Sequence, residues 1–264
     1  MSLVFSALVA AVAVLPLRVC ADPNNLPYSN AAGAGFENKI AELVAHDLGR
    51  TLSYVWRPQR RGFVRETLNA GRCDVMMSVP ANFGPAMPTS PYYASSYVFV
   101  WRRDRMTPVA SLDDPRLRRL RIGIQITGND YNNPPPAQAL ARRHLLNVRG
   151  FTVYGDYSQD DPQRAIVDAV ANGNVDVAIV WGPLAGFYTR NRPALAITPV
   201  SPSHDGRGLQ FVYEIAMATR RDDRVLHDAL NVVLARRRAD IHRILREYGV
   251  PITAEPRTET RHDS

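Results

Sequence analysis

Hydrophobic and polar positions alternate along the first 80 residues between the spacing of a strand and that of a helix. Apolar residues recur at helical intervals from Phe36 to Leu48, and Gly49 follows where a helix C-terminal cap belongs. The predicted elements are a strand from 17, a helix at 36–48, a strand at 51–56, a helix at 62–71 and a strand at 73–79. This order predicts a parallel sheet whose strands are joined by crossover helices.

The same order begins again in the second half of the chain. A proline-rich stretch at 80–91, an aromatic strand at 92–101 and a polar connection at 102–120 separate the two series. The predicted elements that follow are a strand at 121–126, a helix at 134–147, a strand at 151–154, a helix at 163–172, strands at 175–180 and 209–219, and helices at 223–238 and 239–248. The segments 70–75 and 171–177 echo each other as a helix end, a glycine and an Asp-Val that opens a buried strand. We therefore predict an α/β protein with two lobes of one architecture.

Composition narrows the class of protein. With 264 residues, of which 45% are hydrophobic, the chain can bury a large core in one or two domains. The net charge is +7, and Lys39 is the only lysine among the 32 basic residues. The arginines are dispersed without a long basic run, which argues against nucleic-acid binding. A basic face that meets an acidic protein remains open.

An uncharged apolar run covers residues 2–15. It has about the length of a signal-peptide core and is too short to span a bilayer. We predict a signal peptide at 1–16 and export from the cytoplasm; the alternatives are an N-terminal strand or an anchor. The polar tail at 253–264 is predicted to be disordered.

The two cysteines, Cys20 and Cys73, leave two possibilities open. In an oxidising compartment they could form a disulfide. If their strands lie adjacent and parallel, however, an offset of about four residues, at roughly 3.3 Å each, exceeds the reach of a disulfide. We therefore favour two separate buried thiols.

Several segments together resemble the bacterial family 3 solute-binding proteins. They are the opening strand with Asp22 and its loop, Leu68–Val75, Ser90–Tyr93 and the terminal strand and two helices, and the likeness covers roughly residues 17–250. The resemblance implies a type II periplasmic binding protein fold, in which two α/β lobes enclose a ligand cleft. It implies lobe 1 at 17–103 and 207–252, and lobe 2 at 104–206.

A narrower resemblance is to the J-type accessory proteins, MoxJ and XoxJ, found with quinoprotein methanol dehydrogenases. The segments that carry it are Leu17–Asn30, Gly35–Asn38, Arg57–Phe63 and Ser90–Val100. The resemblance implies a periplasmic accessory protein that supports a PQQ-dependent methanol or alcohol dehydrogenase in maturation or activation. It implies no enzyme activity and no cofactor of the protein's own.

The cleft of this protein departs from that of amino-acid receptors. Such receptors usually place an arginine after the third strand, to bind a carboxylate, and an acid after the buried strand of lobe 2. Here Asn82 and Trp181 stand in those places. The lining that remains suits an apolar or neutral polar guest, although each aromatic residue could instead pack in the core. The predicted cleft residues are Asp22, Asn24, Asn25, Tyr28, Arg60, Phe63, Asn82, Tyr92, Tyr93, Gln125, Asn129, Tyr131, Trp181 and Phe187.

Enzyme chemistry has little support in the sequence. Asp22 and Asp130 could form an acid-base pair across the lobes, but no nucleophile is paired with a base. Neither His-x-x-x-His nor Cys-x-x-Cys occurs, so no metal site is predicted. The alternative function is a substrate-binding protein that hands a small neutral or apolar solute to an ABC transporter.

Overall fold

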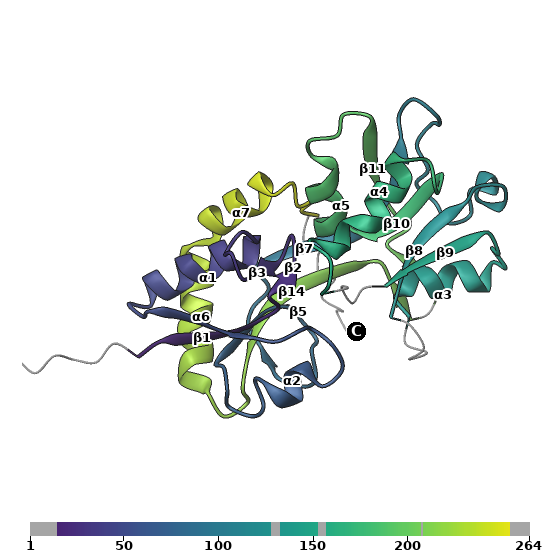
Figure 1. Ribbon diagram of the computed structural model, residues 1–264. Helices are drawn as coiled ribbons and strands as arrows, with labels where there is room; N and C mark the ends of the chain where they lie inside the picture. Colours follow the sequence, from purple (N-terminus) through teal and green to yellow (C-terminus); the bar gives the residue numbers. More distant parts are fainter. Residues whose placement is uncertain (1–14, 128–132, 153–156, 207, 254–264) are drawn as a thin grey trace, which may run out of the picture.

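The computed structural model of the protein describes residues 15–127, 133–152, 157–206 and 208–253. Its described part forms two α/β lobes that share one ten-stranded sheet (Figure 1). The main strand order is β4-β1-β5-β14-β7-β10-β8-β9. The two-lobed α/β fold predicted from the sequence is confirmed. The predicted signal-peptide core and the tail from 254 lie outside the described residues.

The first lobe contains parallel strands that begin the chain and a strand that returns from its C-terminal part. Its strands are β1 (Leu17–Ala21), β4 (Leu52–Trp56), β5 (Val75–Pro80), β6 (Met87–Pro88) and β14 (Val212–Thr219), and its helices are α1 (Phe36–Asp47), α2 (Phe63–Glu66), α6 (Arg224–Arg236) and α7 (Arg238–Glu247). Alternate residues of β1 face opposite sides of the sheet, because strand side chains have a period of two. Val19 packs with the cluster of α1, α6 and α7, whereas Cys20 packs with Phe63 of α2.

The second lobe repeats this arrangement. Its elements are β7 (Tyr93–Arg102), η1 (Pro115–Arg118), β8 (Ile122–Ile126), α3 (Pro135–Arg142), β9 (Val148–Thr152), η2 (Pro162–Arg164), α4 (Ala165–Ala171), β10 (Val177–Trp181), α5 (Gly182–Thr189) and β11 (Leu195–Pro199). Strand β8 pairs in parallel with β9 and β10, as β1 does with β4 and β5. Two short hairpins complete the described chain, β2 (Asn24–Asn25) with β3 (Ser29–Asn30) and β12 (His204–Asp205) with β13 (Leu209–Gln210).

The sequence echo between the two halves corresponds to one repeated ion pair. Asp74, before β5, accepts hydrogen bonds from the backbone N–H of Arg18 at 3.0 Å and from its Nη2 at 2.6 Å. Asp176, before β10, does the same with Arg121, at 2.8 Å and 2.5 Å. In each lobe the aspartate therefore ties the start of one parallel strand to its neighbour, and the arginine lowers the pKa of the aspartate against the opposing effect of burial.

Strand β7 passes from one lobe to the other. Residues 93–96 pair with β14, and residues 97–102 pair with β10 and β11. The chain crosses again at β14, and Thr253 N–H donates to the carbonyl of Ala94 at 2.9 Å. These crossings agree with a two-lobed chain; the lobe boundaries given from the sequence stay a prediction.

Some predicted elements differ from the observed ones. Helix α2 ends at Glu66 and does not continue to Gly71, because Thr67 leaves helical backbone angles and bonds its hydroxyl to the carbonyl of Phe63. Helix α3 ends at Arg142, before His144 takes a positive φ of 53°. Helix α5 and strand β11 were not predicted. Most of α5 is buried, so its residues lack the polar face that reveals an amphipathic helix.

The preference for two separate thiols is wrong, because Cys20 and Cys73 form a disulfide with their Cα atoms 5.5 Å apart. The sequence argument placed Cys73 on a straight extension of the strand. In the structure β5 begins only at Val75, and the chain bends at residues 72 and 74. Although Cys20 stands opposite Met76 in the strand register, the bend brings Cys73 back beside it.

The described helices include none with the length and apolarity needed to cross a membrane.

Candidate functional site

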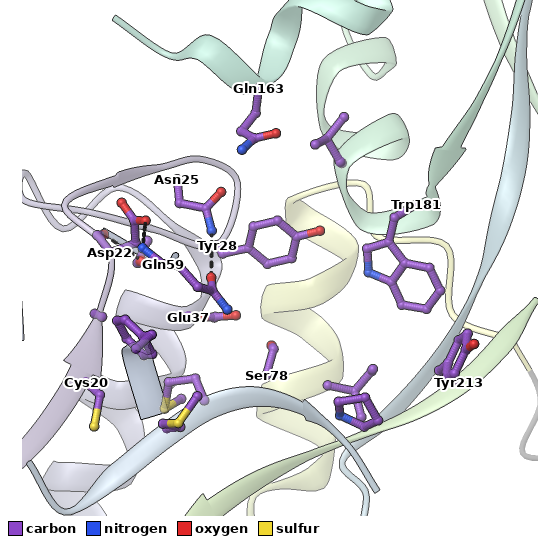
Figure 2. A pocket seen from close by; sticks show the side chains of 18 of the residues that line it. Cys20, Asp22, Asn25, Tyr28, Glu37, Gln59, Ser78, Gln163, Trp181 and Tyr213 are labelled. Carbon is purple, nitrogen blue, oxygen red and sulfur yellow. Dashed lines mark hydrogen bonds between the residues drawn. The ribbon is translucent and has the colours of Figure 1, made fainter. Parts of the chain in front are cut away.

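A cavity of about 450 Å³ lies between the lobes, at the carboxyl ends of β1, β5 and β10 (Figure 2). Ligands of open α/β sheets bind at these strand ends. The residues that line it are Cys20, Ala21, Asp22, Asn25, Tyr28, Ser29, Glu37, Gln59, Phe63, Met76, Met77, Ser78, Pro80, Tyr93, Tyr97, Gln125, Gln163, Trp181, Leu184, Tyr213 and Ile215.

The loop after β1 places Tyr28 and Glu37 in the cavity wall. Gly35 lies so close to the Tyr28 carbonyl that a Cβ at this position would stand 2.0 Å from the oxygen. The carbonyl of Tyr28 accepts the N–H of Glu37 at 2.9 Å, and Asn38 Oδ1 accepts the N–H of Gly35 at 3.0 Å. The segment Gly35–Asn38 therefore folds the loop back onto the first turn of α1, with Glu37 directed into the cavity (Figure 2).

Aromatic rings form much of the opposite wall. Trp181 contacts Tyr97 and Tyr213 edge to face, with ring centroids 5.1 Å and 5.9 Å apart. Tyr28 points across the cavity toward Trp181 (Figure 2). The backbone N–H of Trp181 donates to Gln125 Oε1 at 3.1 Å, which ties the end of β10 to β8. The two lobes thus face each other through aromatic side chains.

Glu37 is the least expected member of the lining. Burial raises the pKa of its carboxyl to about 7; a hydrogen bond with Ser78 lowers it and the charge of Asp22 raises it further. Among the described residues that line the cavity there is no arginine, lysine or histidine. A carboxylate formed here therefore has no basic partner within the described lining.

Tyr93 presents a second polar group that is incompletely satisfied. The residue is 4% exposed, and its hydroxyl lies near Ser78 without completing a hydrogen bond of ordinary geometry within the described chain. The Ser78 hydroxyl stands 3.1 Å from that of Tyr92. Burial raises the pKa of the Tyr93 phenol, which therefore stays protonated.

Asp22 is engaged in holding the lobes together. Its carboxylate accepts the backbone N–H of Asn24 at 2.8 Å, that of Gln59 at 2.6 Å, and the hydroxyl of Tyr157 from the second lobe. Nearby, Asn24 Nδ2 donates to the carbonyl of Gln159 at 2.9 Å. We call these two interlobe hydrogen bonds, Tyr157–Asp22 and Asn24–Gln159, the latch.

A further interlobe contact lies beside the latch. Tyr188 donates to the carbonyl of Leu26 at 3.1 Å, and Phe187 stacks on Tyr248 with centroids 5.8 Å apart. The Arg190 guanidinium lies 3.9 Å from the centroid of the Phe187 ring. The structure therefore shows the lobes in contact on the outer side of the cavity.

The structure places the predicted cleft residues in several different surroundings. Those that line the cavity are Asp22, Asn25, Tyr28, Phe63, Tyr93, Gln125 and Trp181. Asn24 and Phe187 lie at the interlobe contacts, and Arg60 lines an adjoining cavity of about 560 Å³ with its guanidinium 5.0 Å from the Tyr157 ring centroid. Tyr92 packs in the core and Asn82 is exposed in a turn. Asn129 and Tyr131, like Asp130, lie outside the described residues.

The sequence prediction missed several members of the lining. They are Ser29, Glu37, Gln59, Ser78, Tyr97, Gln163 and Tyr213. Glu37 carried a usable signal, because it stands in the first turn of a helix that follows the loop at the end of β1. Tyr97 and Tyr213 gave none, because an aromatic residue inside a strand is equally typical of a core.

We expect Tyr157→Phe to weaken closure of the lobes. The change removes the hydroxyl that Asp22 accepts and leaves the aspartate with its two backbone donors. A hydrogen bond to a charged group contributes about 1.5–3 kcal/mol, so the open population should rise at least tenfold. Small-angle X-ray scattering of the ligand-free protein should show a larger radius of gyration. The matched control is Tyr92→Phe, which removes a hydroxyl contact inside the first lobe; equal radii for the two variants would contradict a latch.

Comparison with known proteins gives relatives that match most of the chain, although no family model matches it. The protein MoxJ of Methylorubrum extorquens is 32% identical over 245 residues, which cover 89% of this chain and 81% of that protein. MoxJ of Paracoccus denitrificans is 31% identical and covers 89% and 88%. The crystal structure of the periplasmic binding protein XoxJ from Methylobacterium extorquens superposes with a TM-score of 0.73 at 34% identity, over 90% of this chain and all of that one.

Proposed function

The chain belongs to the MoxJ family, and on this premise we propose that it is a periplasmic accessory protein of solute-binding fold that supports a PQQ-dependent methanol or alcohol dehydrogenase. Its role is to engage the dehydrogenase during maturation or activation. It acts by binding and performs no catalysis of its own.

The observation that carries the proposal is the extent of the family likeness. It runs through 89% of this chain at 32% identity. The state of Asp22 also supports a binding role. Since the carboxylate already accepts three hydrogen bonds, it is poorly placed to take a proton from a substrate.

The periplasmic location rests on several features together. XoxJ, one of the solved relatives, is a periplasmic binding protein. The Cys20–Cys73 disulfide also favours an oxidising compartment, because such bonds rarely persist in the cytosol.

Affinity capture tests the proposed partnership. The tagged protein should retain the dehydrogenase at low salt, where the net charge of +7 would strengthen binding to any acidic surface of the partner. Capture should weaken at about 1 M salt, where the screening length falls to about 3 Å. Deletion of the protein should impair alcohol oxidation, and the wild-type chain supplied in trans should restore it.

The control is a family 3 receptor with similar net charge, which should retain nothing. If neither the apo nor the PQQ-loaded dehydrogenase is captured, and deletion leaves alcohol oxidation intact, the proposal is wrong.

The cavity between the lobes favours one alternative, a receptor for an ABC transporter. A receptor should close on a solute and respond to loss of a permease, with the dehydrogenase unaffected. Deletion strains that lose uptake of one solute and keep full alcohol oxidation would select this alternative.

A further inference from the structure

We propose that the interlobe cavity is a binding site for a small organic cation of the alkylammonium class, held by the Glu37 carboxylate against the aromatic wall of Tyr97, Trp181 and Tyr213. The inference goes beyond the proposed function, which assigns the cavity no guest. It replaces the neutral guest that the sequence predicted.

The charged side chains in the cavity lining are acidic. Two carboxyl groups, those of Asp22 and Glu37, lie in the wall, and no basic side chain does so within the described chain. Asp22 is occupied by the latch and by backbone donors. Glu37 is therefore the carboxylate available to a guest, and only a positively charged guest would compensate its burial.

Aromatic rings form a wall of the same cavity. Tyr97, Trp181 and Tyr213 form a continuous edge-to-face row along the second side of the cavity, and Tyr28 extends toward Trp181 from the first. The faces of such rings carry negative potential and attract ammonium groups, most strongly when the site is desolvated. Rings on one side and a carboxylate on the other give an alkylammonium both of its preferred surroundings.

A polar group of the same wall lacks a hydrogen-bond partner within the described residues. The Tyr93 hydroxyl is buried and completes no hydrogen bond of ordinary geometry within the described residues. It lies beside Ser78, as Glu37 does, and so adds an unsatisfied polar group behind the carboxyl side of the cavity. The volume of about 450 Å³ lies within the usual range for small-molecule sites, about 300–1,000 Å³.

An anionic guest fits these observations poorly. The first N–H groups of α1 point toward the loop, where the carbonyls of Pro27 and Tyr28 accept those of Phe36 and Glu37 at 2.8 Å and 2.9 Å. The N–H groups of Phe36 and Glu37 are therefore not available to an anion. An anion would also meet the Glu37 carboxylate directly.

Titration calorimetry with choline and with 3,3-dimethylbutan-1-ol tests the charge requirement. The two probes have nearly the same shape, and only choline carries a positive charge. Choline should bind at least about tenfold more tightly, since an ammonium gains both the carboxylate and the rings. Equal affinities, or no detectable choline binding to the purified protein, would overturn the inference.

Glu37→Gln should lower choline affinity by about tenfold or more and leave affinity for the neutral alcohol unchanged. The matched control is Glu42→Gln on the same helix, because the Glu42 carboxyl is exposed and pairs with Lys39 at 3.2 Å. Trp181→Leu should weaken choline binding more than alcohol binding. A Glu37→Gln protein that unfolds cooperatively like wild type and binds choline with wild-type affinity would exclude the carboxylate.

Capture of the dehydrogenase by the same protein separates this inference from the proposed function. Capture without choline binding overturns the cation site alone, whereas choline binding without capture or deletion phenotype overturns the accessory role alone.

Discussion

Replacing Cys20 and Cys73 together by alanine is expected to lower the free energy of unfolding by about 4 kcal/mol. The disulfide joins residues 53 positions apart, and a cross-link of this span removes much of the conformational freedom of the unfolded chain. Both cysteines are buried, at 4% and 0% exposure, so loss of their sulfur atoms adds a small packing cost.

Urea unfolding of the oxidised wild-type and double-alanine proteins measures this effect. The control repeats the urea unfolding of both proteins under reducing conditions, which break the disulfide of the wild-type protein. The two proteins should then differ only by the packing cost. If oxidised and reduced wild-type protein unfold at the same urea concentration, the disulfide contributes nothing to stability.

Glu37→Gln is expected to change how stability depends on pH. The folded-state pKa of about 7 exceeds the ordinary value of 4.5, so the folded protein holds this proton while the unfolded chain releases it. The free energy of unfolding of the wild type, relative to that of the glutamine variant, is therefore constant below about pH 4.5. It falls as the pH rises from about 4.5 to about 7, and it stays at the lower value above about pH 7. At about 1.36 kcal/mol per unit, the total loss is up to about 3 kcal/mol.

Urea unfolding of both proteins at pH 5 and at pH 8 tests this slope. All the groups coupled to Glu37 by charge or hydrogen bonding are retained in the variant: Asp22, Tyr28, Tyr54, Ser78, Tyr92 and Tyr93. Glu42→Gln should show the wild-type slope, because that carboxyl is exposed. If the free energy of unfolding changes equally with pH in the wild type and in Glu37→Gln, Glu37 ionises normally in the folded protein.

Cys20 and Glu37, the residues changed in these two experiments, both line the cavity between the lobes. Cys20 lines the cavity from β1, and its bond to Cys73 secures the strand whose end carries the loop of Asp22 and Tyr28. Stability and ligand binding should therefore respond together. Reduction of the disulfide offers a way to examine that coupling without a substitution.

Local patterns in the sequence were enough to predict most of the architecture. Helix α1 was predicted from apolar spacing and Gly49, and the repeated Asp-Val segments indicated two equivalent lobes. Each of these signals depends on residues close together in the chain. Strand periodicity, helix periodicity and capping are local properties, so a single sequence expresses them directly.

The site required the tertiary structure because its members come from separate elements. The sequence alone determined that a polar loop with Asp22 and Tyr28 follows the first buried strand, and that Trp181 ends a buried strand of the second half. Only the fold decided that Glu37 turns into the cavity, that Tyr157 engages Asp22, and that a bend joins Cys73 to Cys20. The physical reason is that the orientation of a helix about its axis, the closure of two lobes and the path of a bend depend on packing between distant segments, which no local pattern of residues encodes.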